Sequence, residues 1–378
     1  MKSQIYADNA ATTPLDKVAF DALIPWLSEN YGNASQPYAF SREPKKALAE
    51  ARETIAACIH ALPEEIYFTS GGTEGDNWAI KGSAFADVLK KTTITTTFEH
   101  HAVLHSCKAI EHLGYPVVYL RPNSDGIIVP DSLRKALDDQ PRFVSVMYAN
   151  NEIGTIQPIK ALCSLAHECR ALFHTDAVQA LGHTKIDVHD LGVDMLSASA
   201  HKFNGPKGIG FLYLRKGTKI LSYADGGAQE HGMRAGTENV ASIIGMAVAL
   251  KHNCDSLSDN EAHVTGLEQM LLEGLRAVGI SFVRNGGGYK LPGLISLSFD
   301  GADGEALLHR LDLMGISVST GSACNSANTE ISHVLKAIGL RESLAKGTIR
   351  ISLGKYNTDD DVDFIVVALK KILGSYAK

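Results

Sequence analysis

Residues 143–176 read FVSVMYANNEIGTIQPIKALCSLAHECRALFHTD, and this stretch decides the fold. Residues 143–148 form a short apolar run with the length of a buried strand, and residues 171–175 form another. Between them, residues 159–170 carry a helical pattern of apolar positions. A strand, a helix and a second strand make the crossover unit that parallel strands require. The stretch therefore predicts an α/β fold.

The same alternation continues on both sides of this unit. Further buried strands are predicted at Ile66–Thr69, Thr92–Thr97, Val117–Leu120, Met195–Ser199 and Gly210–Leu214. Helical patterns separate most of them, as at Ala102–Leu113. We therefore expect a large domain with a mostly parallel sheet that is covered by helices.

The rhythm of the sequence changes after about residue 255. A long amphipathic stretch, Asn260–Val278, leads into a second set of elements. They are the strands Leu294–Phe299, Ile316–Ser319 and Thr348–Leu353 and the helices Glu305–Met314 and Ser332–Ile338. A last helix should begin after Thr358, an N-cap residue that three aspartates follow. We expect a smaller α+β domain at the C-terminal side.

Composition excludes several classes of protein. The 378-residue chain carries a net charge of −6 and no long basic run, so nothing draws it to nucleic acid or to an anionic membrane. No apolar stretch approaches the roughly 20 residues of a membrane span, and the N-terminus lacks the apolar core of a signal peptide. The six cysteines form no CxxC pair, so no metal site is expected. These features indicate a cytoplasmic protein.

Hydrogen-bonding or ionisable residues follow five successive strands. The segments are Ser70-Gly71-Gly72-Thr73, Glu99-His100-His101, Asn150-Asn151-Glu152, His174-Thr175-Asp176 with Gln179, and Ser197 to Lys202. In open parallel sheets, ligands bind beyond the carboxyl ends of the strands. Chance could place one or two such segments there, but five together favour a ligand site.

The residue types indicate the chemistry of that ligand. The glycines at 71 and 72 ahead of a helix suit an anion, although such a pair can also form a simple turn. Asp176 follows a buried strand and needs a cation such as a protonated pyridine nitrogen, or it could cap the following helix. Lys202 lies on a tight loop, where burial would make its amine nucleophilic towards an aldehyde. His100 could cover a flat ring or be a structural histidine.

At these residues the chain resembles the cysteine desulfurases, and its cysteine loop resembles that of group I. The matching strings, in the family's order, are DNAATTP from Asp8, FTSGGTEGDN, EHHAVL, NNEIGTIQP, HTDAVQ, SASAHKFNGPKGIG, GMRAGTEN, STGSACNSA and IRISLG. The resemblance implies the aminotransferase class V fold, also called fold type I of the pyridoxal phosphate enzymes. It also implies a homodimer, with a large domain of residues 15–257 and a small domain of residues 1–14 and 258–378.

The resemblance also implies which residues bind the cofactor, pyridoxal 5'-phosphate. The phosphate ligands would be Gly72, Thr73, Ser199 and His201, with Thr237 supplied by the partner subunit. Lys202 resembles the Schiff-base lysine, and Asp176 the group that faces the pyridine nitrogen. His100 matches the residue stacked on the ring. Gln179 and Asn151 match contacts to the phenolic oxygen and to the substrate.

For the reaction itself, the resemblance implies that L-cysteine is converted to L-alanine. Arg350 matches the residue that binds the substrate carboxylate, and Asn151 assists it. Lys202 would remove the α-proton. Cys324 matches the nucleophile that becomes a persulfide, and His100 is a candidate acceptor for its proton. The loop that follows Gly321 resembles the longer, flexible cysteine loop of the first group, which could carry sulfur to an acceptor protein.

The chain departs from the usual family pattern at five positions. They are Gly72 where alanine is common, Tyr38, His231, Gly293 and Ile331. None of them removes a catalytic group, but they leave the branch of the family open. The sulfur acceptor could therefore be an iron–sulfur scaffold protein, a tRNA-thiolating enzyme or a DNA phosphorothioation partner.

Three alternatives to this function are considered. Another pyridoxal phosphate enzyme of the same fold, such as an aminotransferase or a selenocysteine lyase, would share most of the site, although an aminotransferase needs no cysteine at position 324. A cofactor-free scaffold protein would show no Schiff-base absorption. A hydrolase could pair Cys324 with His333, although that spacing alone is weak support.

Overall fold

The computed structural model describes residues 4–86, 89, 91–137, 141–320 and 331–374. A seven-stranded sheet in the order β2-β8-β7-β6-β5-β3-β4 forms its centre. The strands are β2 (Ile66–Thr69), β3 (Thr92–Thr96), β4 (Val117–Leu120), β5 (Pro141–Ser145), β6 (Leu172–Asp176), β7 (Met195–Ser199) and β8 (Gly210–Leu214). Only β8 runs antiparallel to its neighbours, β2 and β7. The predicted α/β fold with a mostly parallel sheet is therefore confirmed.

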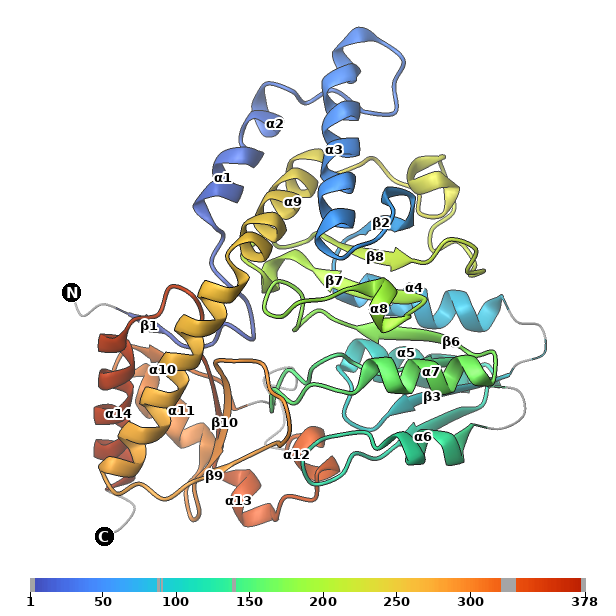
Figure 1. Ribbon diagram of the computed structural model, residues 1–378. Coiled ribbons are helices and arrows are strands. Elements are labelled where there is room, and N and C mark those ends of the chain that lie inside the picture. Colours follow the sequence, from blue (N-terminus) through green and yellow to red (C-terminus); the bar gives the residue numbers. More distant parts are fainter. Residues whose placement is uncertain (1–3, 87–88, 90, 138–140, 321–330, 375–378) are drawn as a thin grey trace.

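Helices cover both faces of this sheet (Figure 1). They are α3 (Arg42–Cys58), α4 (Gly72–Phe85), α5 (His101–His112), α6 (Pro130–Ala136), α7 (Ile159–Glu168), α8 (Val188–Leu191) and α9 (Val240–Asp255). Phe143 packs with Trp78 of α4 and with α5 on one face. The next residue, Val144, packs in the cluster of α3, α7 and α9 on the other face. Successive side chains of a strand point to opposite faces, so a sheet buried on both sides needs continuous apolar runs.

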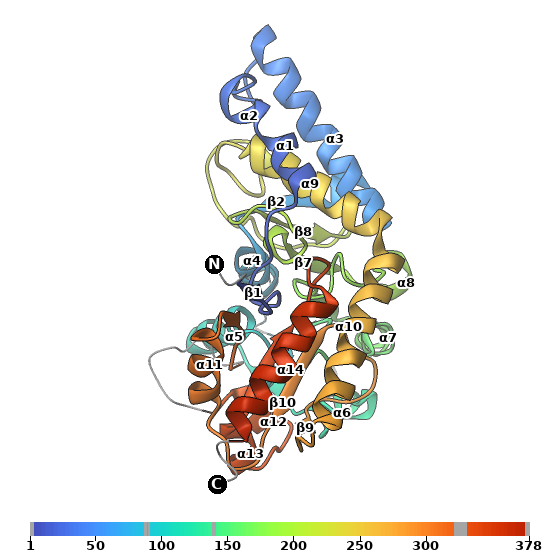
Figure 2. The same ribbon diagram turned by 90° about the vertical axis from the view of Figure 1, so that its left-hand side faces the viewer.

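A second group of elements has its own core (Figure 2). Its strands are β1 (Ile5–Tyr6), β9 (Val283–Arg284), β10 (Leu294–Ser298), β11 (Ile316–Ser317) and β12 (Thr348–Ser352), and its helices are α10 (Leu257–Ala277), α11 (Gly304–Asp312) and α14 (Asp359–Leu373). Two short helices from the same part of the chain, α12 (His333–Ala337) and α13 (Glu342–Lys346), instead pack Val334, Leu335 and Ala345 into the core of the large sheet. The side chain of Thr358 caps α14, as predicted. We retain the domain limits as a proposal; α9 and α10 meet at Ser256.

The chain near its N-terminus links the two groups of elements. β1 pairs with β11 in parallel, Asp8 then bridges Ser352 of β12, and the chain runs on to the turn that follows β7 of the large sheet. There the backbone N–H of Thr13 donates to the carbonyl of His201 over 2.9 Å. Two short helices, α1 (Lys17–Leu23) and α2 (Pro25–Ser28), follow and pack against α9. Among the helices of the described ranges, none combines the length and the apolar character that a membrane span needs.

Candidate active site

A cavity of about 660 Å³ lies where the carboxyl ends of the parallel strands meet. The predicted site residues that line it are Gly72, Thr73, His100, Asn151, Asp176, Gln179, Ser199, His201, Lys202 and Arg350. Thr237 is exposed and does not line this cavity. Cys324 lies outside the described residues. The fold therefore brings into one cavity residues that are far apart in the sequence. Gly72 and Arg350, for example, are 278 positions apart.

The cavity has a cradle for an anion at the start of α4. Gly71 has a φ of +149°, a backbone conformation that residues other than glycine rarely adopt. Its neighbour Gly72 begins the helix. The first N–H groups of a helix lack intrahelical partners and lie at the positive end of its dipole. Ser199 lies close by, because its Oγ is 3.4 Å from where a Cβ on Gly71 would be. Hydroxyl and backbone donors of this kind suit a phosphate.

An ion pair ties this cradle to the segment that carries Thr237. Glu74, in the first turn of α4, accepts a hydrogen bond from the backbone N–H of Ser70 over 3.0 Å. It also accepts one from Arg234 Nε over 2.8 Å. Thr237 is three residues beyond Arg234, and it does not line the cavity of its own chain.

Lys202 ends a short 3-10 turn, Ala200–Lys202, that follows β7 directly. Its Nζ donates hydrogen bonds to the carbonyls of Ala10 over 2.6 Å and Ala11 over 2.9 Å. The backbone of the turn is held from behind, because His183 Nε2 donates to the Lys202 carbonyl over 2.7 Å. Burial lowers the pKa of His183, which keeps that ring neutral. The amine is thus fixed at the mouth of the cavity, on a supported loop as predicted.

Asp176 ends β6 and is buried. Burial raises its pKa to about 6, although the N–H of Val178 and the charge of Lys202 act in the opposite direction. Asp76, buried on α4, has a pKa raised well above its usual value by burial and by the charge of Asp176. Two buried carboxyl groups this close do not both ionise, so Asp76 keeps its proton. Asp176 is then the carboxylate that a cation in the cavity would stabilise.

Asp176 caps a turn, and not the α-helix that the alternative role would require. Asp176 Oδ1 accepts from the N–H of Val178 over 2.9 Å, but a turn and not an α-helix follows. Behind it, His174 bridges Ser145 and Ser197 with its two ring nitrogens, each over 2.9 Å. Burial lowers the pKa of His174 to about 3, so this ring is a neutral support.

His100 caps α5 and lines the cavity, so both roles considered for it are present. Its Nδ1 accepts a hydrogen bond from the N–H of Ala102 over 3.1 Å. Burial and the charge of Lys202 lower its pKa to about 4. The ring is therefore neutral near pH 7, and because Nδ1 is an acceptor we assign the proton to Nε2. At Nε2, the resting ring is a hydrogen-bond donor.

Arg350, from the centre of β12, reaches the cavity from the second group of elements. It is 4% exposed, and its guanidinium donates to the Asn151 carbonyl and to Asp8 Oδ1, each over 2.8 Å. Its Nε has no partner, and neither has the buried Oε1 of Gln179. A buried polar atom left unsatisfied costs roughly 1–3 kcal/mol. These two atoms therefore mark where a polar ligand would be stabilised.

One further segment, residues 8–13, contributes to the site although its sequence does not mark it as a strand end. Asp8 pairs with Arg350, the carbonyls of Ala10 and Ala11 hold Lys202, and Thr12 Oγ1 lies 3.1 Å from His201 Nδ1. The segment follows the strand Ile5–Tyr6 directly. The same rule would have found it, but a strand of two residues carries too short an apolar run to be recognised.

Two of the departures from the family pattern have neighbours that fill the space. A Cβ at Gly72 would lie 2.4 Å from Val178 Cγ2, so Val178 occupies the volume that an alanine would need. A Cβ at Gly293 would lie 2.2 Å from Val264 Cγ1, and Gly293 has a φ of +76°. Both glycines are therefore matched to the residues packed against them.

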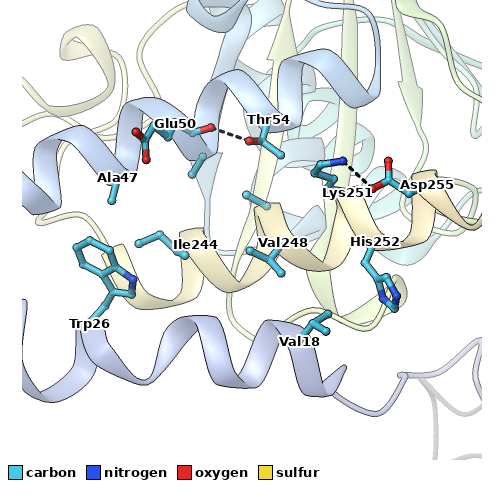
Figure 3. A pocket seen from close by; sticks show the side chains of 12 residues that line it. Val18, Trp26, Ala47, Glu50, Thr54, Ile244, Val248, Lys251, His252 and Asp255 are labelled. Atoms are coloured by element: carbon cyan, nitrogen blue, oxygen red, sulfur yellow. Dashed lines mark hydrogen bonds and ion pairs between the residues drawn. The ribbon is translucent and has the colours of Figure 1, made fainter.

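A second hollow lies outside the sheet, between α1, α3 and α9 (Figure 3). Its volume is about 440 Å³, and Trp26, Ile244 and Val248 point into it. The polar groups at its rim are already paired, as where Lys251 Nζ contacts Asp255 Oδ2 over 2.6 Å. Over the described ranges, no group of three His, Cys, Asp or Glu side chains could hold a metal ion.

Comparisons with known proteins agree with this geometry. The family model of aminotransferase class-V matches residues 5–365. A protein of Dictyoglomus turgidum named cysteine desulfurase IscS is 47% identical over 375 residues, which covers 99% of this chain and 95% of that protein. A solved NifS-like protein superposes with a TM-score of 0.93 at 37% identity, covering 99% of this chain and 100% of the other. The structure of SspA in complex with cysteine gives 0.84 at 36%, covering 94% and 100%.

Proposed function

The chain belongs to the aminotransferase class-V family and, within it, to the cysteine desulfurases, which convert L-cysteine to L-alanine, and we propose that it does so with pyridoxal phosphate held by Lys202 and with Cys324 as the sulfur acceptor. One observation carries the cofactor assignment. An anion cradle, a lysine amine and a buried carboxylate that needs a cation converge on one cavity. These are the three groups that a phosphate, an aldehyde and a pyridine nitrogen require.

The residues of the cavity fit the cofactor group by group. When bound, pyridoxal phosphate withdraws electrons from the α-carbon of an amino acid. Its phosphate would be held by Gly72, Thr73, Ser199 and His201, at the cradle of α4. Asp176 would hold a proton on the ring nitrogen, with its own charge preserved because Asp76 stays neutral. The unpartnered Oε1 of Gln179 and the nearby Asn151 would meet the polar edge of the ring or the substrate.

Three residues would orient cysteine and move its proton. Arg350 supplies a fixed positive charge for the substrate carboxylate, with Nε unpartnered and the plane of its guanidinium held by Asp8 and by the Asn151 carbonyl. Lys202 Nζ, once free of the carbonyls that hold it, would take the proton from the α-carbon. Asn151 lines the cavity beside Arg350 and would contact the substrate.

The sulfur step would belong to Cys324. Its thiolate would attack the sulfur of the substrate, so that an S–S bond forms while the C–S bond breaks and alanine is left. The resting His100 carries its proton on Nε2, which changes the role expected for it. We assign it a hydrogen bond to the reacting sulfur, where it would stabilise thiolate character, in place of taking the proton of Cys324.

The quaternary structure and the partners are part of the same proposal. Thr237 is exposed, lies outside the cavity of its own chain and follows Arg234, which is fixed to the cradle helix. This placement supports a homodimer in which Thr237 reaches the phosphate of the partner subunit. The sulfur on Cys324 would pass to an acceptor protein, for which an iron–sulfur scaffold, a tRNA-thiolating enzyme and a DNA phosphorothioation protein are the candidates. We propose a cytoplasmic location.

The test compares the protein with its Cys324→Ser variant in the presence of pyridoxal phosphate and cysteine. Both should show the visible absorption of a bound cofactor, because Lys202 and the cradle are unchanged. Only the unaltered protein should yield a persulfide-bearing peptide by mass spectrometry and pass sulfur to an added acceptor. Normal persulfide release by the variant would remove Cys324 from the mechanism. Absence of visible absorption in both would instead contradict the cofactor assignment.

A further inference from the structure

Two cysteines from different helices share a cavity that adjoins the groove between α1, α3 and α9, because Thr54, Lys251 and Asp255 line both. Cys58 is the last residue of α3, and Cys254 is the penultimate residue of α9. Both line one cavity of about 660 Å³, and both are partly exposed. Their side chains interact, because each shifts the pKa of the other. The two thiols are thus neighbours in one cavity that a small molecule can enter from solvent.

The surroundings make the two thiols unequal. The interaction with Cys58 lowers the pKa of Cys254, whereas the interaction with Cys254 and burial raise the pKa of Cys58. Lys251, which also lines this cavity, favours the thiolate form, and Asp255, with which it is paired, opposes it. A thiolate is the attacking form in exchange reactions, and a neighbouring thiol is what resolves a mixed disulfide. Cys254 is therefore placed to attack and Cys58 to resolve.

The other described cysteines lack this arrangement. Cys107 and Cys163 are buried, and burial raises the pKa of both, for Cys163 to about 12. Cys163 does contact His167, which pairs with Asp194, but its side chain is closed off from solvent. A metal is also disfavoured, because the described residues contain no cluster of three ligands. Reversible oxidation is what remains for a neighbouring, accessible pair.

We propose that Cys58 and Cys254 form a redox-active dithiol that reacts with low-molecular-weight disulfides and closes to a disulfide between α3 and α9. The thiolate of Cys254 attacks one sulfur of the small disulfide, breaks its S–S bond and releases one thiolate. Cys58 then gives its proton to that thiolate and attacks the sulfur of Cys254, which releases the second small thiolate. This thiolate takes up a proton from solvent, which balances the proton that Cys254 lost when it ionised. In total, two protein thiols are oxidised and one small disulfide is reduced to two thiols.

The bridge would form beside a support of the active-site loop. Asn253, the residue before Cys254, donates from Nδ2 to the carbonyl of Phe203, the residue after Lys202, over 2.8 Å. α9 ends at Asp255, and α10 begins two residues later. A disulfide here would fix the end of α9 to α3, so oxidation is placed to act on the loop of Lys202. Reduction by dithiothreitol should reverse it.

The test treats the full-length protein with oxidised glutathione, alkylates the remaining thiols and digests it with trypsin without reduction. Cys58 and Cys254 fall in separate tryptic peptides, residues 53–81 and 252–276, and neither peptide contains another cysteine. The reacted protein should give these two peptides joined, and dithiothreitol should separate them. Cys324 lies in residues 311–336, so any glutathione that it takes is read separately.

Two variants assign the steps. Cys58→Ser should leave glutathione trapped on Cys254, and Cys254→Ser should leave Cys58 unmodified at the same exposure. Cys169→Ser, which alters another partly exposed cysteine, should join the two peptides as the unaltered protein does. Far-UV circular dichroism checks that each variant is folded. Absence of the joined peptide in the unaltered protein, or glutathione trapped on Cys58 in Cys254→Ser while Cys254 stays unmodified in Cys58→Ser, would overturn the proposal.

Discussion

The cavity at the strand ends and the groove between α1, α3 and α9 are both hollows, but their polar atoms differ. In the cavity, Asp76 Oδ1, Gln179 Oε1 and Arg350 Nε are buried without partners. In the groove, no lining side chain has such an atom within the part of the chain that the structure describes, and Lys251 and Asp255 satisfy each other (Figure 3).

This difference teaches which hollow is built for a ligand. Folding leaves buried polar atoms unpaired only at a cost, so several of them around one cavity indicate that a bound molecule offsets it. Size does not separate the two hollows, because an apolar groove between three helices also results from imperfect packing. The predictions that follow test whether activity and pH dependence belong to the cavity alone.

The largest difference is expected between two lysines, Lys202 in the cavity and Lys251 in the groove. Lys202→Ala should lower alanine formation from cysteine by at least about 1,000-fold, because the reaction that we propose uses that amine. Lys251→Ala should leave the rate within about twofold. Alanine is measured by chromatography at saturating pyridoxal phosphate. Equal losses in the two variants would break the comparison between the hollows.

The next effect tests how Arg350 is held. Arg350→Lys keeps the charge but loses the planar guanidinium that contacts Asp8 and the Asn151 carbonyl together. The KM for cysteine should rise by about 100-fold, with a smaller change in kcat. The control is Arg276→Lys on α10, where the side chain is exposed and neither constant should change. An unchanged KM in Arg350→Lys would remove this residue from substrate binding.

The third prediction concerns the pH dependence of stability without cofactor. The pKa of Asp176 is raised on folding from 3.8 to about 6, so the folded state binds its proton more tightly than the unfolded state does. The stabilisation that this protonation gives to the folded state is fully present below pH 3.8, and it is lost as the pH rises through 6. Asp176→Asn should therefore be more stable than the unaltered protein at pH 7, on the order of 2 kcal/mol, and the gap should close towards pH 4. Urea unfolding at both pH values measures it.

The control for that prediction lies in the groove. Asp255→Asn removes an exposed carboxylate from its pair with Lys251, and because exposed pairs contribute about 1 kcal/mol or less, it should change stability by no more than that at either pH. A gap for Asp176→Asn that is the same at both pH values would show that burial of its charge is not the cause.

A smaller effect tests the packing beneath the cradle. Gly72→Ala should destabilise the protein by about 1–2 kcal/mol, because the new methyl group meets Val178 at 2.4 Å. Val178→Ala in the same chain should recover most of that loss. Thermal unfolding of the two single variants and the double variant gives the coupling. Simple addition of the two effects would refute the match between these residues.

The smallest effect is expected in the groove. Val248→Ala removes two methyl groups from a half-buried side chain on α9 and should cost about 1 kcal/mol or less. Cysteine turnover should not change. A loss of turnover without a loss of stability would mean that the groove contributes to the reaction after all.

Much of this architecture could be predicted from local sequence. The runs Ile66–Thr69, Met195–Ser199 and Gly210–Leu214 coincide with β2, β7 and β8, because a strand covered on both faces needs uninterrupted apolar residues. The predicted run Phe143–Tyr148 shifts to Pro141–Ser145 as β5. The sequence stays apolar beyond Ser145, the last residue of β5 that pairs with β6. Hydrophobicity alone therefore does not fix where strand pairing stops.

The site residues that could be predicted from the residues themselves are those that end or follow a strand, such as Asp176 and Lys202. Contacts between distant segments were not predicted, since no local pattern couples Asp8 to Arg350 or sets Asp76 behind Asp176. The hydrogen-bonding state of His100 also required the structure, because it depends on the N–H of Ala102. The assignment of Cys324 remains a prediction.

The pairing of Asp8 with Arg350 has a consequence for biosynthesis. The two residues are 342 positions apart, and their ion pair fixes Arg350 in the wall of the pocket that Lys202 also lines. During translation the seven-stranded sheet can form early, but this pocket stays open on one side until the ribosome has made and released residue 350. The nascent enzyme should therefore be unable to retain its cofactor tightly, and loading becomes one of the last events in its maturation.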